Sequence, residues 1–184
     1  DITGSKEDIE GSDRRMNVSS RSDSRIYYNS REESLSFGLT WDDSSTATSD
    51  YVAIWINDHT THTLVVEGVE IGSQYGSNWQ IQSISSPVAG GGTATTPVSL
   101  NRRVTTVAQA TARTADSSTV TIGGSIETIL SHFSVGDAAS GGRFIDTHDA
   151  VRIGPGQAFA VQCILSATSP VLTQGTVVAY YEAS

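Results

Sequence analysis

The sequence predicts an all-β protein: an antiparallel two-sheet β-sandwich of jelly-roll type, with an extended N-terminal arm. Strong helix formers are scarce, whereas Val, Ile, Thr and Ser are common, a mixture that favours strands and polar loops. Segments with a period of two recur along the chain, separated by clusters of Gly, Pro, Ser and Asp. The length of 184 residues fits one domain, and a closed barrel is the second architecture that this pattern allows.

Residues 1–33 are predicted to form a polar arm, and residues 34–184 the sandwich. The arm carries no hydrophobic period. Its stretch 14–31 has a net charge of +4, whereas residues 34–184 have five basic and twelve acidic residues and a net charge of −7. A basic segment ahead of an acidic body indicates docking on an acidic surface, and a solvated linker is the other interpretation. The candidate docking residues are Arg14, Arg15, Arg21, Arg25 and Arg31.

The first half of the body contains the clearest strand patterns. Residues 34–41 alternate apolar and polar side chains, which predicts a half-buried strand. Residues 51–57 are apolar on both faces, which predicts a central strand, and a polar loop should precede it at 42–50. In residues 62–71 the apolar positions change face at Gly68, which predicts a β-bulge there.

The second half is predicted from turn signals. A short strand near 79–84 is followed by an exposed loop or crossover at 85–97, and residues 104–112 form a strand with small side chains. An alanine-rich helix over 106–115 competes with that strand. Further along we expect a hairpin of 118–122 and 126–135 around Gly123-Gly124, a loop at 136–149, and closing strands at 150–153, 157–166 and 174–182, with Gly154-Pro155-Gly156 as a tight turn.

Composition excludes several classes of protein. The net charge of −9 argues against non-specific binding of nucleic acid, which needs a basic face. The longest uninterrupted apolar run, residues 51–56, is too short to cross a membrane. The single cysteine excludes a disulfide framework within the chain, and its place on an apolar stripe predicts that Cys163 is buried.

Few residues are candidates for chemistry. His59 and His62 flank a predicted turn and are weak candidates for zinc ligands, because no further ligand can be identified. Two acidic loops supply oxygen ligands of the kind that Ca²⁺ prefers, but neither has the spacing of a dedicated Ca²⁺ loop, so we expect solvated loops. No motif for a catalytic nucleophile or a phosphate loop is present, so we expect neither an enzyme nor a cofactor. The acidic loop residues are Asp42, Asp43, Asp50, Asp137, Asp146 and Asp149.

The aromatic residues divide into two groups. Trp41 and Trp55 lie on strand faces with other apolar residues and are expected in the core. Tyr75 and Trp79 lie in the loop-and-strand segment 72–80 and are expected to be exposed. Exposed aromatic rings are the usual platform for sugars, so these two residues are candidate contacts with a glycan.

Several segments together resemble the β-sandwich virion proteins of tailed bacterial and archaeal viruses, namely decoration or cement, turret and fibre-base proteins. They are the strand pair in 51–71, the stretch 92–101, Ile153-Gly-Pro-Gly-Gln-Ala-Phe-Ala-Val-Gln162 and the closing strand 175–182. The resemblance implies a non-enzymatic structural protein on the capsid surface of a virion. Its partners would be the major capsid protein or other virion proteins and its own copies, in a homotrimer. The arm would attach it, with neither nucleic acid nor membrane involved. A glycan- or receptor-binding sandwich of the adhesin kind is the alternative.

Overall fold

The computed structural model describes residues 35–46, 49–101, 103, 105–116, 118–134, 143–165 and 171–183. The predicted arm, residues 1–33, lies outside this part of the chain. Every regular element of the described residues is a β-strand, and none of them forms a helix that could span a membrane. The strands are β1 (Ser36–Thr46), β2 (Ser49–Asn57), β3 (His62–Ser73), β4 (Ser77–Gly91), β5 (Thr93–Thr95), β6 (Val98–Ser99), β7 (Ala110–Thr114), β8 (Val120–Ser134), β9 (Arg143–Ile153), β10 (Ala158–Leu165) and β11 (Val171–Ala183).

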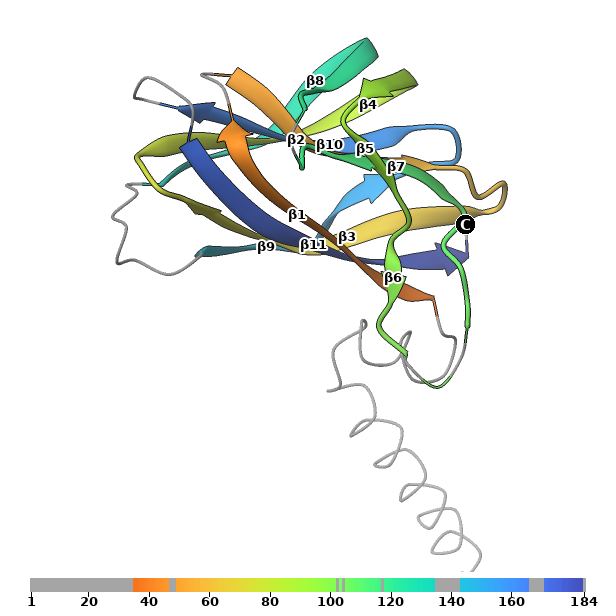
Figure 1. The fold of residues 1–184 in the computed structure, drawn as a ribbon. Coiled ribbons are helices and arrows are strands. Elements are labelled where there is room, and N and C mark those ends of the chain that lie inside the picture. Colours follow the sequence, from red (N-terminus) through yellow and green to blue (C-terminus); the bar gives the residue numbers. More distant parts are fainter. Residues whose placement is uncertain are drawn as a thin grey trace, which may run out of the picture.

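The strands form two antiparallel sheets that pack against each other, which confirms the predicted β-sandwich (Figure 1). The five-stranded sheet has the order β6-β1-β11-β3-β9. In the six-stranded sheet β10 lies between β2 and β4, β4 pairs with β8, and β7 and β5 extend the sheet beyond β2. Most consecutive long strands, such as β1 and β2 or β3 and β4, lie in different sheets, so the chain crosses between the layers repeatedly, whereas β4 and β8 pair within one sheet.

The main hydrophobic core fills the space between the sheets. The alternating residues Phe37, Leu39 and Trp41 of β1 are buried in it, as their period of two predicts. Trp55 of β2 is also fully buried, which confirms that it and Trp41 are core residues. Edge-to-face packing between Phe37 and Tyr181 and a tilted contact between Trp41 and Trp79 join aromatic rings from different strands.

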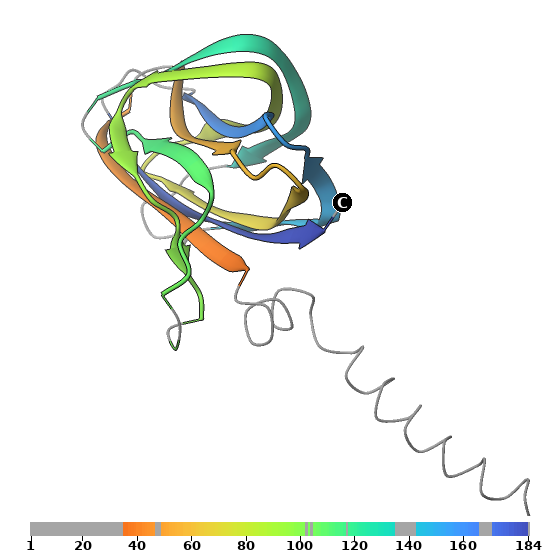
Figure 2. The ribbon, with the colours of Figure 1, turned by 90° about the vertical axis from the view of Figure 1, so that its right-hand side faces the viewer.

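A second, smaller core lies on the other face of β2 and β10. The long strands β4 and β8 curl together, and β10 lies inside the curve (Figure 2). Ile54, Ala158 and Ala160 turn away from the main core and are fully buried in this second cluster, together with Ile84 and Val120. β2 is therefore buried on both faces along its centre, which confirms its predicted central position.

The irregularity predicted at Gly68 is present. The register of β3 against β11 shifts between Gly68 and Val66, so Glu67 is the extra residue of a bulge. On the other side of β3, Thr147 of β9 fills the irregular stretch, and its Oγ1 donates to the carbonyl groups of Val66 and Glu67. Leu64 and Val69, on either side of the bulge, both reach the main core, as do Val66 and Ile71.

The hairpin predicted at Gly123-Gly124 is wrong: residues 120–134 form one continuous strand, β8. The two glycines lie opposite an irregular stretch of β4 between Ser85 and Val88. Gly124 has a φ of +120°, and a Cβ there would meet the carbonyl oxygen of Ser85 at 2.7 Å. The glycines therefore permit the bend of a long strand pair rather than a reversal of the chain.

Other predicted loops are largely strand. Residues 85–91 extend β4, residues 42–46 extend β1, and residues 143–149 belong to β9. In each case backbone pairing with a distant strand outweighs the local preference of Gly, Ser and Asp for turns. Between 104 and 115 the described residues form a strand only from Ala110 to Thr114, so the competing helix there is wrong.

The end of the chain follows the prediction. β10 and β11 are strands, and Gly154-Pro155-Gly156 forms a tight turn in which Gly156 has a φ of +71° and Gln157 N donates to Gly154 O at 3.1 Å. β11 lies between β1 and β3, and Tyr181 N donates to Leu35 O at 3.0 Å. The first and last described residues of the sandwich therefore meet at one corner.

Candidate functional site

The two candidate zinc ligands lie together on the turn between β2 and β3. The ring centroids of His59 and His62 are 3.9 Å apart, and Thr61 Oγ1 lies 3.0 Å from His62 Nδ1 and 3.5 Å from His59 Nδ1. Asp58, the nearest acidic neighbour in sequence, accepts a hydrogen bond from Thr111 at 2.8 Å. Among the residues that the structure describes, no three His, Cys, Asp or Glu side chains form a group that could hold a metal.

The same geometry affects the charge of the turn. Burial lowers the pKa of His59, and the neighbouring His62 lowers it further because two imidazolium rings repel each other. His59 also packs on the ring of Tyr181, with a centroid distance of 5.5 Å. The arrangement therefore favours the neutral form of His59, whose ring is tilted against the rings of His62 and Tyr181.

Below this turn, Asn57 connects two loops. Its Nδ2 donates to His62 O at 2.8 Å and to Ile153 O at 3.0 Å, and its Oδ1 accepts from His59 N at 3.0 Å. Its backbone joins the Gly154–Gln157 turn through two further hydrogen bonds. Asn57 is fully buried. Its side chain therefore holds the histidine turn in place and is not exposed to a ligand.

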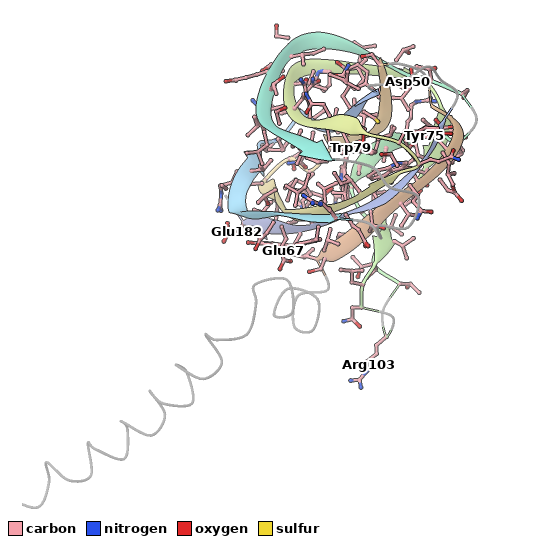
Figure 3. All side chains as sticks on the ribbon, turned by 90° about the vertical axis from the view of Figure 1, so that its left-hand side faces the viewer. Asp50, Glu67, Tyr75, Trp79, Arg103 and Glu182 are labelled. Atoms are coloured by element: carbon pink, nitrogen blue, oxygen red, sulfur yellow. The ribbon has the colours of Figure 1, made fainter. Side chains whose placement is uncertain are left out.

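The predicted pair of exposed aromatics is only half correct. Tyr75, between β3 and β4, is exposed, but Trp79 is 1% exposed (Figure 3). Trp79 lies on the inward face of β4, and its Nε1 donates to Ser77 Oγ at 2.7 Å inside the protein. Trp79 is therefore a core residue and not a contact for a glycan, because strand parity and not proximity to a loop decides its direction.

Cys163 is buried, as predicted. Burial and, to a smaller extent, the carboxylate of Asp50 together raise the pKa of its thiol to about 12. At neutral pH the sulfur therefore carries its proton and is a poor nucleophile. The thiol fills the core next to Ser77, which accounts for its presence without a chemical role.

A hollow that the sequence did not reveal opens on the five-stranded sheet. It has a volume of about 280 Å³ and spans β1, β11 and β3. Two carboxylates, an amide and two hydroxyls line it, which gives it many hydrogen-bonding groups and two negative charges. They come from three strands that are distant in sequence, so no local sequence motif predicts that they lie together. These residues are Thr40, Asp42, Glu70, Gln174 and Thr176.

A segment between β5 and β7 that projects from the sandwich is the second feature that was not predicted from the sequence. After β5 the chain leaves the six-stranded sheet, pairs briefly with β1 through β6, and returns to the sheet at β7; the described residues of this segment are 96–101, 103 and 105–109. Val98 and Val107 are 54% and 68% exposed, and Arg103 lies at the far end of the projection (Figure 3). The segment presents apolar and basic side chains away from the body of the sandwich.

The five candidate docking arginines of the arm, Arg14, Arg15, Arg21, Arg25 and Arg31, lie outside the described residues. On the body, the exposed Arg152 of β9 pairs with Glu182 of β11.

No protein-family model, curated protein or solved structure matches this chain.

Proposed function

We propose that the protein is a structural, non-enzymatic component of a virus particle, located on the capsid surface as a decoration, cement, turret or spike protein. It acts by packing against its own copies and against the major capsid protein or other virion proteins. This proposal follows from the resemblance of the sequence to β-sandwich virion proteins. It is supported by one structural observation, the order of the eight long strands.

That order is β1-β11-β3-β9 in one sheet and β2-β10-β4-β8 in the other. In each sheet the last long strand in sequence lies beside the first, and successive long strands alternate between the sheets except for β4 and β8, which are neighbours in one sheet. This is the arrangement of two interlocked Greek keys, and we infer that the sandwich is a jelly roll. Jelly rolls are common in viral capsid proteins and in lectins, so the argument is one of fold and not of a reactive site.

The arm extends the proposal. Its five arginines, within a stretch of net charge +4, complement an acidic partner surface, and the body of this chain itself has a net charge of −7. Extended residues span about 3.3 Å each, so 33 residues suffice to reach a neighbouring copy or the shell. We propose that the arm ties the sandwich to such a surface.

The location on the particle is tested by labelling gradient-purified virus particles with an antibody against the sandwich. We expect the protein to sediment with intact particles and the antibody to decorate their outer surface in electron microscopy. A protein found only in the soluble fraction, with no label on particles, contradicts the proposal.

The arm is tested by adding purified protein to particles stripped of it. Replacement of the five arm arginines by glutamine should abolish rebinding, while the single exposed change Arg103→Gln, on the projecting segment, should leave it intact. Equal rebinding of the arm variant and the native chain contradicts arm-mediated attachment.

Recognition of a glycan is the second candidate function. The hollow lined by Asp42, Glu70 and Gln174 favours it, because carboxylates and amides bind sugar hydroxyls. A glycan array should then yield ligands whose binding is lost in Asp42→Ala and retained in Tyr75→Ala. Binding that instead depends on Tyr75 would place the sugar elsewhere, and the absence of any ligand on the array contradicts this function.

A further inference from the structure

The two ends of the six-stranded sheet differ in how many strands extend them. Beyond β2, the chain adds β7 and β5 as further strands. At the other end, β8 pairs with β4 along nearly its whole length, and with β2 only through Val120 and Tyr51. Among the described residues, no other strand pairs with the second edge of β8 after Val120. The outer rim of the curled strand pair in Figure 2 is this edge.

The middle of this edge, Ser125–Ser131, is exposed at every position. It contains three large apolar side chains, Ile126, Ile129 and Leu130, which are 43%, 38% and 37% exposed. Its single charged residue is Glu127, and it has neither Lys nor Pro. Soluble monomers usually protect a sheet edge with such residues, because an open row of N–H and C=O groups pairs readily with another strand.

We propose that the β8 edge, Ser125–Ser131, is an interface between two copies of this chain, which pair antiparallel along it. The backbone groups of the edge require an extended strand as partner, and the apolar side chains require an apolar one. The β8 edge of a second copy meets both requirements. This interface rests on the proposed function, which supplies many identical copies in one assembly.

Charge favours a second copy over an acidic or basic partner. The edge offers a single carboxylate to a charged partner, so electrostatic recognition there is weak. Between two copies related by a two-fold axis, every antiparallel register except the one centred on Glu127 keeps the two carboxylates from lying directly opposite each other. Paired copies therefore bury apolar area without opposing like charges.

The irregularity of β8 limits the interface. Ile129 is the extra residue of a bulge opposite Ile81 and Gln82. A bulge bends the strand and interrupts regular pairing. The backbone ladder between copies should therefore lie before the bulge, at Ser125–Thr128, while Ile129 and Leu130 add apolar contact beside it.

The interface is tested with two matched double variants of the full chain. Ile126→Lys/Ile129→Lys puts two charges on the β8 edge, and Val98→Lys/Val107→Lys puts the same charges on exposed apolar residues of the projecting segment. Light scattering over a range of concentrations gives the mass of each, and thermal unfolding shows that each remains folded. We expect the native chain to associate, the β8 variant to associate at least tenfold more weakly, and the control to behave like the native chain.

Amide hydrogen exchange adds a readout at the edge itself. Within residues 125–128, the amides that point away from β4, which alternate with those facing it, should be protected in the associated native chain and should lose that protection on dilution. If the β8 variant keeps the native mass while the native chain still labels virus particles, the edge is not the interface and the proposed function stands. If the native chain is monomeric at every concentration and absent from particles, both proposals fail.

Discussion

The buried thiol of Cys163 is the most sharply defined single group in the core. Its pKa of about 12 in the folded chain predicts negligible alkylation by iodoacetamide at pH 8 and rapid alkylation in denaturant. Mass spectrometry of timed samples measures both rates. Fast labelling of the folded protein contradicts the described burial.

The same thiol sets a dependence of stability on pH. Its pKa in the folded chain lies above the ordinary value of 9.0, so its contribution is complete below pH 9.0 and is lost as the pH rises toward 12. Urea unfolding at increasing pH should show this loss in the native chain, and Cys163→Ala should show less of it. An identical pH profile in the variant contradicts the assignment.

The histidine turn has the opposite dependence. Because the pKa of His59 is lowered in the folded chain, the unfolded chain takes up its proton first as the pH falls below 6.5. Stability should therefore be highest above pH 6.5 and should decrease below it. Thermal unfolding across this range should show a smaller decrease for His59→Gln, and an unchanged decrease in that variant would locate the dependence elsewhere.

Gly175 of β11 shows how closely the side chains and backbone of neighbouring strands pack within the five-stranded sheet. A Cβ at this position would overlap the ring of Trp41 and the carbonyl oxygen of Glu70. We expect Gly175→Ala to destabilise the protein by about 1–3 kcal/mol, the usual cost of overpacking. Gly38→Ala is the control in β1, since its Cβ would lie 3.6 Å from Leu100, an ordinary contact. Chemical unfolding compares the two, and equal stability contradicts the close packing.

At the scale of elements, Asn57 at the end of β2 fastens two neighbouring turns. Asn57→Ala removes three side-chain hydrogen bonds and leaves buried backbone groups without these partners, which should cost about 3 kcal/mol. Asn78→Ala loses one exposed hydrogen bond with Ser131 and should cost well under 1 kcal/mol. Chemical unfolding gives both values, and similar losses would contradict the role of Asn57.

The elements also show what a sequence can predict. The period of two in β1, the apolar β2 and the bulge in β3 were predicted because the apolar residues of a strand record which of its faces are buried, one face in β1 and both faces in β2. The continuity of β8 through Gly123-Gly124 was not, because that strand is fixed by its pairing with β4, which the local sequence does not record. The same limit applies to the candidate sites, because the open edge of β8 can be recognised only when the order of the strands is known.

At the scale of the whole molecule, net charge opposes assembly. Each copy carries a formal charge of −9, so neighbouring copies repel each other. Salt shortens the range of this repulsion from about 10 Å at 0.1 M to about 3 Å at 1 M ionic strength. Self-association measured by sedimentation should therefore strengthen as NaCl is raised, and weaker association at high salt would show that ion pairs, such as those of the arm, hold the copies together.

The hydrogen bond between Leu35 and Tyr181 makes the sandwich suitable for circular permutation. Because the two ends of the sandwich are hydrogen-bonded neighbours, a short peptide can join them and new ends can be opened at the Gly154–Gly156 turn. Such a circular permutant keeps every strand pairing described above. Because Tyr181, Leu64 and Ile153 lie in one row across the sheet, the new ends stay at the same end of the sandwich but move from β1 and β11 to the loop beside the histidine turn, so a fused partner would leave the protein from a different strand.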